Sequence, residues 1–372
     1  MNAVIRSTGL WVPDDTISND ELVDSYNAHV TRYNDEHNEA IMRGTIEAKN
    51  PSSSSFIEKA SGIKSRYTVD KVGALDVDRM RPNVAKRPDN ELCLMAEAGV
   101  AAAKAALAEA GRDASDVDAV ICSATTMQRT YPCIAVEIQN ALGVDGFAYD
   151  MSVACSSGTF GIISAVNLIQ TGQARSVLLV TPEITTPQLN FRDRDSHFIF
   201  GDVAVAMLIE AEDMAGDGNG WAIKSTRMMT KFSNNIRSNL GYLNACETPE
   251  PAFEDRYFSQ EGRKVFKEVC PMVSALILEE LEKSGLSAAD MKRLWLHQAN
   301  INMNSMVARK VFGRDYTQEE APIVLDEFAN TAGAGSLVAF HRHHDGFEPG
   351  DKGLICSFGA GYSIGNVIIE KR

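Results

Sequence analysis

Short apolar runs alternate along this chain with longer stretches of helical pattern. Aliphatic and β-branched runs predict strands at Val117–Ser123, Ser176–Thr181, Ala204–Ile209, Arg293–His297 and Gly353–Ser357. Between them, helices are predicted at Glu91–Gly111, which is Ala-rich and closed by glycine, and at Ser156–Gly172, whose apolar positions suit a buried helix. This alternation predicts an α/β protein with layered, mostly parallel strands.

The chain divides most readily at Asp213–Asn219, where small and turn-forming residues separate two apolar runs. We therefore expect an N-terminal unit over residues 1–212 and a C-terminal unit over residues 220–372. The segment AVAMLIEAE near the end of the first unit echoes GNVIIEKR at the end of the second, which indicates an internal duplication. Two polar stretches without a strong period, Asn27–Ser55 and Thr68–Asn90, are expected to be loop or cap insertions near an active site.

Composition excludes several classes of function. The chain has 372 residues, with 36 Lys and Arg against 50 Asp and Glu, so its formal charge is −14, which argues against nucleic-acid binding. No apolar run approaches the ~18 residues of a membrane span, and no secretory signal pattern begins the chain, so we expect a cytoplasmic protein. The 7 cysteines include no CxxC pair, which argues against a disulfide framework or a zinc site.

Three segments that are far apart in the sequence carry candidate chemistry: DMSVACSSGTFG around Cys155, WLHQANINM around His297 and DEFANTAGAGS around Asn330. Cys155 is expected at a strand-to-helix turn, where backbone N–H groups and the helix dipole favour a nucleophilic thiolate. Taken singly, each residue has an ordinary structural alternative: a buried cysteine, a core histidine or a capping asparagine. The small residues of Phe358–Tyr362 form either a tight turn or a loop whose N–H groups approach a carbonyl.

Together, the cysteine, the HQAN segment, the Asn-Thr segment and the GxG loop, in this order, resemble the ketoacyl-acyl-carrier-protein synthase III family of the thiolase superfamily. The resemblance covers nearly the whole chain and includes TGLWVP, SGIKSR, TYPCIAVEIQNALG and FGD; the two polar stretches lie outside it. It implies a thiolase-like, duplicated αβαβα fold, with mixed or parallel five-stranded sheets and buried helices.

The resemblance also implies the reaction. Cys155 would take an acyl group from an acyl-CoA, and a malonyl group on acyl carrier protein would attack it after losing carbon dioxide. His297 and Asn330 would hold the malonyl thioester oxygen, and the backbone N–H groups of Cys155 and Ala360 would form the oxyanion hole. Ala360 stands where the family commonly has glycine, so its φ must be negative. This route needs neither a metal nor an organic cofactor.

Binding residues follow from the same resemblance. Tyr131 would reach across a homodimer to close the partner's acyl pocket, its alternative being an ordinary core tyrosine. Phe56 and Arg194 would hold the adenine of coenzyme A, although the alternating charges of FRDRDSH also fit a solvated face. Carrier-protein docking would use Lys267, Arg309 and Lys310. HQAN is followed by Ile301 and Asn302, where the family commonly has a docking arginine, so we expect weaker or differently placed docking.

Two rival functions remain. A thiolase-type acyl-CoA acyltransferase would use a second cysteine before the GxG loop, for which Cys356 is the candidate. A noncatalytic partner subunit would usually lack one of the three reactive residues. The cluster His341, His343, His344 and Asp345 is interpreted as a solvated surface at a helix end rather than a metal site. For the primer we expect a medium-chain acyl-CoA such as octanoyl-CoA.

Overall fold

The computed structural model describes residues 2–216, 220–239 and 241–372. Its strands are β1 Ala3–Trp11, β2 Asp15–Ser18, β3 Ser65–Thr68, β4 Ala119–Ser123, β5 Phe147–Met151, β6 Ser176–Glu183, β7 Val203–Ala211, β8 Trp221–Ser233, β9 Ile236–Arg237, β10 Ser259–Gln260, β11 Met291–Leu296, β12 Lys352–Gly359 and β13 Gly361–Lys371. Its α-helices are α1 Asn19–Glu36, α2 Asn38–Met42, α3 Ser54–Ser61, α4 Lys71–Leu75, α5 Leu94–Ala110, α6 Ile134–Leu142, α7 Ser157–Gln170, α8 Glu212–Ala215, α9 Gly262–Lys283, α10 Ile301–Phe312, α11 Leu325–Phe328 and α12 Gly335–Arg342. Each strand and helix predicted from the sequence is present, with ends shifted by a few residues.

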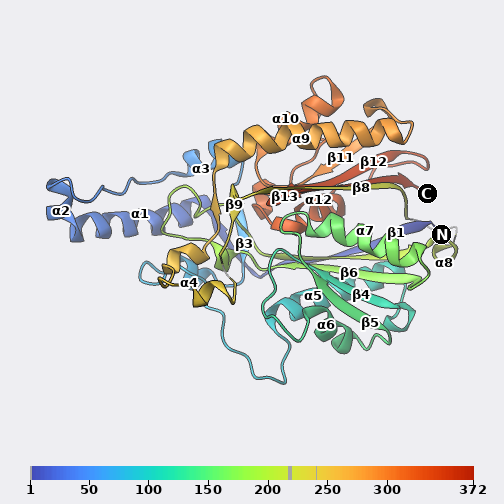
Figure 1. The fold of residues 1–372 in the computed structure, drawn as a ribbon, viewed down its shortest axis with the longest axis horizontal. Coiled ribbons are helices and arrows are strands. Elements are labelled where there is room, and N and C mark those ends of the chain that lie inside the picture. Colours follow the sequence, from blue (N-terminus) through green and yellow to red (C-terminus); the bar gives the residue numbers. More distant parts are fainter. Residues whose placement is uncertain (1, 217–219, 240) are drawn as a thin grey trace.

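Five layers build the body of the molecule, as the predicted αβαβα fold requires. Figure 1 shows α9 and α10 on one outside, α5 and α6 on the other, and α7 and α12 between the two sets of strands. The strands alternate accordingly: Val205 and Met207 of β7 face the central helices, whereas Ala206 and Leu208 face the outer cluster around α5. Because both faces of these strands are covered, they read in the sequence as continuous apolar runs.

The two halves repeat one arrangement of strands. The sheet order is β11-β12-β13-β8-β1-β7-β6-β4-β5, and β7 lies between β1 and β6 as β13 lies between β8 and β12. The two segments that echo each other in sequence are therefore topological equivalents. The expectation of two five-stranded sheets needs correction, since five strands of the first half join four of the second in one mixed sheet of the described chain. The expectation of mostly parallel strands is also wrong, because five of the eight neighbouring pairs in this sheet are antiparallel. The unit boundary itself remains a prediction; α8 covers part of the expected linker, and residues 217–219 lie outside the described residues.

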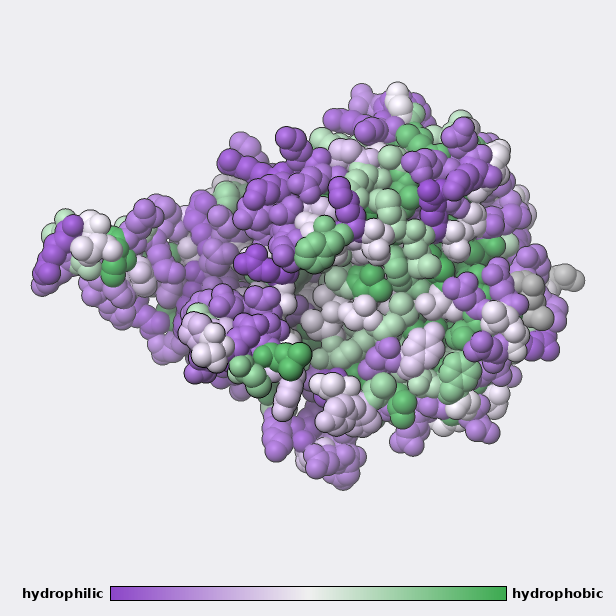
Figure 2. Space-filling model, viewed as in Figure 1, coloured by the Kyte–Doolittle hydropathy of each residue, from purple (hydrophilic) through white to green (hydrophobic). Residues whose placement is uncertain are grey.

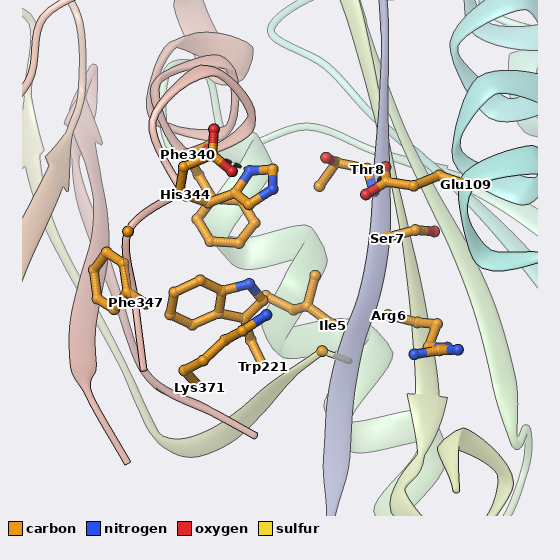
Figure 3. A pocket seen from close by; sticks show the side chains of 13 residues that line it. Ile5, Arg6, Ser7, Thr8, Glu109, Trp221, Phe340, His344, Phe347 and Lys371 are labelled. Atoms are coloured by element: carbon orange, nitrogen blue, oxygen red, sulfur yellow. Dashed lines mark hydrogen bonds between the residues drawn. The ribbon is translucent and has the colours of Figure 1, made fainter. Parts of the chain in front are cut away.

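The joint between the halves is short and lies away from the candidate chemistry. Strands β1 and β8 pair only at Val4 with Ala222 and Ile5 with Trp221. Trp221 packs edge-on against Phe340 and Phe347, with ring centroids 5.5 and 4.8 Å away. Figure 3 shows these rings beside a cavity of about 290 Å³, with His344 and Lys371 at its edge. All three rings belong to the C-terminal half, and Trp221 carries this cluster to the short pairing with β1, where it lies opposite Ile5.

A cap built largely from the two polar stretches extends from this body (left in Figure 1). The expectation of a loop is wrong for residues 27–36, which continue the 18-residue helix α1. Beyond Val30 the helix buries no side chain; its polar face instead clamps a returning segment, because Asn27 exchanges two hydrogen bonds with the backbone of Ser52, and Asn34 does the same with Lys49. Asparagine contacts of this kind leave no hydrophobic period, so the sequence pattern could not reveal the helix.

Candidate active site

Cys155 stands at the turn between β5 and α7, as predicted. The preceding residue, Ala154, has a φ of 46°, a value uncommon for a residue with a Cβ. The turn is held by the Val153 N–H, which donates to Ser157 Oγ at 2.9 Å, and by Ser156 Oγ, which donates to the Ser363 carbonyl of β13 at 3.0 Å. These bonds fix the thiol at the junction of the two halves, with only 8% of the residue exposed.

The protonation state of Cys155 differs from the expectation. Burial raises the pKa of the thiol to about 12, and the neighbouring Glu183 acts in the same direction. The backbone N–H groups of Ala360 and of Cys155 itself favour the thiolate but do not offset the loss of solvation. The start of α7 therefore does not produce a standing thiolate, and the thiol must lose its proton as it reacts.

His297 and Asn330 reach the same cavity from the C-terminal half. His297 follows β11, and its burial lowers the pKa to about 4, so the imidazole is neutral near pH 7. Its Nδ1 is buried without a hydrogen-bond partner among the described residues, and a neutral imidazole has one ring N–H to donate. Asn330 follows α11, and its Oδ1 accepts the Ala332 N–H at 2.9 Å, which leaves the Nδ2 group as a donor. Two neutral donors thus accompany the thiol.

The cavity that these three residues line is small and leads to a wider tunnel. Cys155, His297 and Asn330 share about 40 Å³ with mostly apolar side chains, including Phe258 and Met303. Asn330 and Met303 also line a second cavity of about 410 Å³, whose wall includes Phe56 and the exposed Arg263. A flexible chain entering at Phe56 can therefore approach the thiol past Asn330.

Glycine is required at position 359 by its distance from the thiol. A Cβ placed on Gly359 would lie 2.5 Å from the Cys155 Cβ and 2.9 Å from its Sγ. Ala360, at the turn between β12 and β13, is not among the non-glycine residues of positive φ, as its side chain demands. Its N–H favours the thiolate form of Cys155. The loop thus presents a backbone donor at the reacting sulfur, the arrangement an oxyanion hole needs.

Sequence reasoning missed one buried acid beside this site. Glu183 ends β6, and its Oε1 accepts the Thr125 N–H, the Thr125 hydroxyl (both 2.8 Å) and the Gly333 N–H (2.9 Å). Gly333 lies in the segment of Asn330, and its virtual Cβ would be 3.3 Å from the Ala154 carbonyl. Burial raises the pKa of Glu183 to about 8. A glutamate ending an otherwise apolar strand, SVLLVTPE, was the available signal.

The residues assigned to coenzyme A lie in contact with each other, and Phe56 lines the second cavity. The Arg194 guanidinium stacks directly on the Phe56 ring, 4.0 Å from its centroid, and donates to the Pro51 carbonyl at 2.8 Å. The two side chains are in direct contact, so an adenine could bind between them only if they moved apart. FRDRDSH is consequently not a simple solvated face at Arg194, although Arg194 also lies 3.7 Å from Asp195.

Tyr131 is not the core residue of the alternative interpretation, since 81% of it is exposed. It precedes α6, near β5, which is the edge strand of the large sheet. Phe147, on that edge strand, is also exposed. Figure 2 shows hydrophobic residues gathered in the middle of the visible face, over α7 and the strands beside it.

The three docking cations are exposed, with Lys267 on α9 and the neighbours Arg309 and Lys310 on α10. Lys267 lies in the second turn of α9, whose first turn lines the tunnel mouth through Arg263. Arg309 and Lys310 lie in the last turn of α10, roughly 12 Å along the helix from its start near the tunnel. Arg309 pairs with Asp315 at 3.2 Å. Arg263, which the sequence analysis did not single out, is the basic residue at the mouth itself.

Two remaining candidates take structural places. The histidine cluster is half-buried rather than solvated, and His341 shares a hydrogen bond of 2.7 Å with Thr8 Oγ1. Within the described ranges no group of three or more His, Cys, Asp or Glu side chains is arranged to hold a metal. Cys356 packs in the outer cluster of β12 with α9, and it does not line the Cys155 cavity. Burial raises the pKa of its thiol far above the ordinary range, so it is placed for packing rather than acid–base chemistry.

Helices of the described chain do not combine the length and apolar content that crossing a membrane requires.

Comparison with known proteins is consistent along the whole chain. The family model described as 3-oxoacyl-[acyl-carrier-protein (ACP)] synthase III matches residues 149–231, and that of its C-terminal part matches residues 281–371. A beta-ketodecanoyl-[acyl-carrier-protein] synthase of Pseudomonas aeruginosa is 54% identical over 350 residues, which cover 94% of this chain and 100% of that protein. A beta-ketoacyl-[acyl-carrier-protein] synthase III of Agrobacterium fabrum is 31% identical over 278 residues, 74% of this chain and 84% of that protein.

The fold has matching solved structures. The crystal structure of 3-oxoacyl-[acyl-carrier-protein] synthase III from Aquifex aeolicus superposes with a TM-score of 0.77 over 99% of both chains, at 22% identity. That of the synthase III from Pseudomonas aeruginosa gives a TM-score of 0.76 at 23% identity, covering 100% of this chain and 98% of that one. At these identities the likeness establishes the thiolase-like fold.

Proposed function

Because the chain belongs to the 3-oxoacyl-[acyl-carrier-protein] synthase III family, and is therefore a condensing acyltransferase of fatty acid biosynthesis, we propose that it joins a medium-chain acyl-CoA primer to malonyl-ACP through an acyl-Cys155 intermediate. The main observation in support is that Cys155, His297 and Asn330, which come from distant segments, line one cavity. Octanoyl-CoA is the proposed primer: the P. aeruginosa relative is named for a ketodecanoyl product, and a ten-carbon chain that takes two carbons from malonyl needs an eight-carbon primer.

The first half-reaction transfers the acyl group. The Cys155 sulfur attacks the thioester carbonyl of the primer as its proton leaves, and the coenzyme A sulfur departs and takes up a proton. The backbone N–H groups of Cys155 and Ala360 stabilise the negative charge on the carbonyl oxygen during this step. Because burial raises the pKa of the Cys155 thiol to about 12, transfer of the proton accompanies bond formation rather than preceding it.

The second half-reaction forms the carbon–carbon bond. The malonyl thioester loses carbon dioxide, and the electrons of the broken bond form an enolate. His297 and the Asn330 amide are neutral, and they stabilise the negative charge on the enolate oxygen by donating hydrogen bonds to it. The enolate carbon then attacks the acyl carbonyl on Cys155, and the thiolate leaves, giving 3-oxoacyl-ACP.

Two further features belong to this proposal. An exposed Tyr131 beside the edge strand β5 supports a homodimer in which each tyrosine closes the partner's acyl pocket. The cavity at Cys155, about 40 Å³, holds about one water molecule, so an octanoyl chain requires flexible lining residues such as Met303 to move. We expect carrier docking at Lys267, Arg309 and Lys310, with Arg263 nearest the tunnel, and action in the cytoplasm.

Acylation measured by intact mass tests the function. Wild-type protein incubated with octanoyl-CoA should gain one octanoyl group, and Cys155→Ala should gain none. A series from acetyl-CoA to decanoyl-CoA then ranks the primers, with malonyl-ACP added to follow condensation. Faster acylation by acetyl-CoA than by octanoyl-CoA would refute the medium-chain assignment, and a mass gain in Cys155→Ala would refute the nucleophile.

A further inference from the structure

The two polar stretches that lie outside the family resemblance enclose a cavity of about 420 Å³ in the cap. One stretch contributes Lys49, the other Arg79 and Arg81, and the segment after β6 contributes Arg192. Phe253 and Tyr257 complete the wall, and Figure 1 shows their short helical segment (gold) beside α4. No residue assigned above to catalysis, coenzyme A or the carrier lines this cavity.

Its four cations, Lys49, Arg79, Arg81 and Arg192, have no carboxylate within ion-pair distance among the described residues. The lining contains two acids, Asp78 and Glu254. Asp78 pairs with Arg32, which lies outside the lining, at 2.5 Å. In a chain with 14 more acids than bases, unpaired cations gathered in one hollow are unexpected. Their charge is available to a bound anion.

Main-chain carbonyls hold Lys49, Arg79 and Arg192 in place instead, and the Arg81 guanidinium lies over the Phe253 ring, 5.7 Å from its centroid. Lys49 Nζ donates to the Arg192 carbonyl at 3.2 Å, and Arg192 Nη2 donates to the Asp78 carbonyl at 2.9 Å. The Lys49 backbone is clamped by Asn34 of α1. The positive potential is visible at His29, whose pKa falls to about 4 through burial and through the nearby charges of Lys49, Arg192 and Arg32. The site is therefore organised before any ligand enters.

The cavity lies next to the tunnel mouth. Lys49 bonds to the carbonyl of Arg192, and two residues further along both segments Arg194 bonds to the carbonyl of Pro51. Residues two apart are at most about 7 Å apart along a chain. Arg194 covers Phe56, which lines the cavity that also reaches Asn330. A ligand held at Phe56 can thus place a phosphate in the cationic cavity.

We propose that this cavity binds the 3′-phosphate of the primer's coenzyme A moiety. The inference rests on the proposed function only in taking the primer to be an acyl-CoA. A phosphate monoester carries up to two negative charges and accepts the paired N–H groups of arginine, so Arg81 and Arg192 suit it better than a neutral ligand. The inserted segments then serve to recognise the coenzyme A moiety of the primer rather than its acyl chain.

The test separates the phosphate from the rest of the primer. Calorimetry measures the Kd of 3′,5′-ADP for wild type, for the double variant Arg81→Gln with Arg192→Gln, and for the control Arg43→Gln, an exposed arginine of the cap that pairs with Glu39. Single-turnover acylation of Cys155 is then compared for octanoyl-CoA and octanoyl-3′-dephospho-CoA. Circular dichroism melting checks that all three proteins are folded.

We expect the double variant to raise the Kd of 3′,5′-ADP about 10- to 100-fold and to weaken the binding of octanoyl-CoA by a similar factor. The binding of octanoyl-3′-dephospho-CoA, and the acylation rate at saturating thioester, should stay unchanged. The proposal would be overturned if the double variant bound both thioesters equally more weakly, or if its Kd for 3′,5′-ADP were unchanged. So would inorganic phosphate binding as tightly as 3′,5′-ADP, which would make the cavity a free-phosphate site. Failure of octanoyl-CoA to acylate wild type would instead strike the proposed function, while the 3′,5′-ADP titration would still decide the cavity.

Discussion

Replacing Glu183 by glutamine removes an acid beside the Cys155 turn while keeping the oxygen that accepts the three hydrogen bonds. All three donors, from Thr125 and Gly333, converge on Oε1, which the glutamine carbonyl can replace. The alanine variant is less informative, because it would orphan two backbone N–H groups at about 1 to 3 kcal/mol each, a large part of a typical stability of about 5 to 15 kcal/mol. The glutamine variant should therefore fold and report on charge alone.

The expected effect is on the ionisation of Cys155. Above about pH 8 Glu183 is charged, and this charge contributes to the raised pKa of the thiol. A unit charge at roughly 6 to 10 Å changes a neighbouring pKa by about 1 to 2 units when the effective dielectric constant is about 20. Glu183→Gln should accordingly lower the pKa of Cys155 by about that amount.

Alkylation of Cys155 by iodoacetamide, followed by intact mass between pH 7 and the alkaline limit of folding, measures this shift. The rate at a given alkaline pH should be about 10-fold or more higher in Glu183→Gln than in wild type. A conservative change elsewhere in the fold, Glu39→Gln on α2, serves as the matched control. A profile in Glu183→Gln that coincides with wild type, or moves to higher pH, would refute the electrostatic reasoning.

Further predictions concern stability, space and role. The raised pKa of Glu183 stabilises the fold most below its ordinary value of 4.5, and this contribution is lost as pH rises toward 8; the melting temperature of wild type should therefore fall over that window relative to Glu183→Gln, and parallel curves would contradict this. Gly359→Ala should reduce acylation at least about 100-fold with the fold intact by circular dichroism, because its Cβ would overlap Cys155; near-normal acylation would show that the loop can retreat. Cys356→Ser should keep its turnover of octanoyl-CoA and malonyl-ACP, whereas a loss specific to kcat would revive a thiolase-type role. His297→Ala should still acquire the octanoyl mass but lose malonyl decarboxylation about 100- to 1,000-fold, as followed by carbon dioxide release; equal loss of both steps would contradict a role confined to the enolate.

The sequence predicted the fold where burial is complete on both faces. Strands such as β6 and β12 are largely apolar runs because helices cover both of their faces, and such runs can be recognised in the sequence alone. The helix α1 was not predicted, and its second half was expected to be a loop because asparagine hydrogen bonds, not an apolar stripe, hold it there. Periodicity detects only the elements whose stability comes from a hydrophobic face.

The candidate site was predictable to the level of residue type and position, but not of state. The motifs around Cys155, His297 and Asn330 identified three side chains, whereas the sequence expectation of an activated thiolate was wrong, because the loss of solvation is a property of the packed cavity. Glu183 was missed for the same reason, since nothing in SVLLVTPE says that its carboxyl meets Thr125 and Gly333.

By itself, then, the sequence determined the layered α/β architecture and the class of reaction and predicted the candidate reactive residues, because each of these depends on residue types and their order along the chain. Only the tertiary structure decided the protonation of Cys155, the exposure of Tyr131 and the gathering of Lys49, Arg81 and Arg192 around one cavity. Solvation and electrostatic potential depend on what surrounds a group in space, and residues far apart in sequence supply those surroundings.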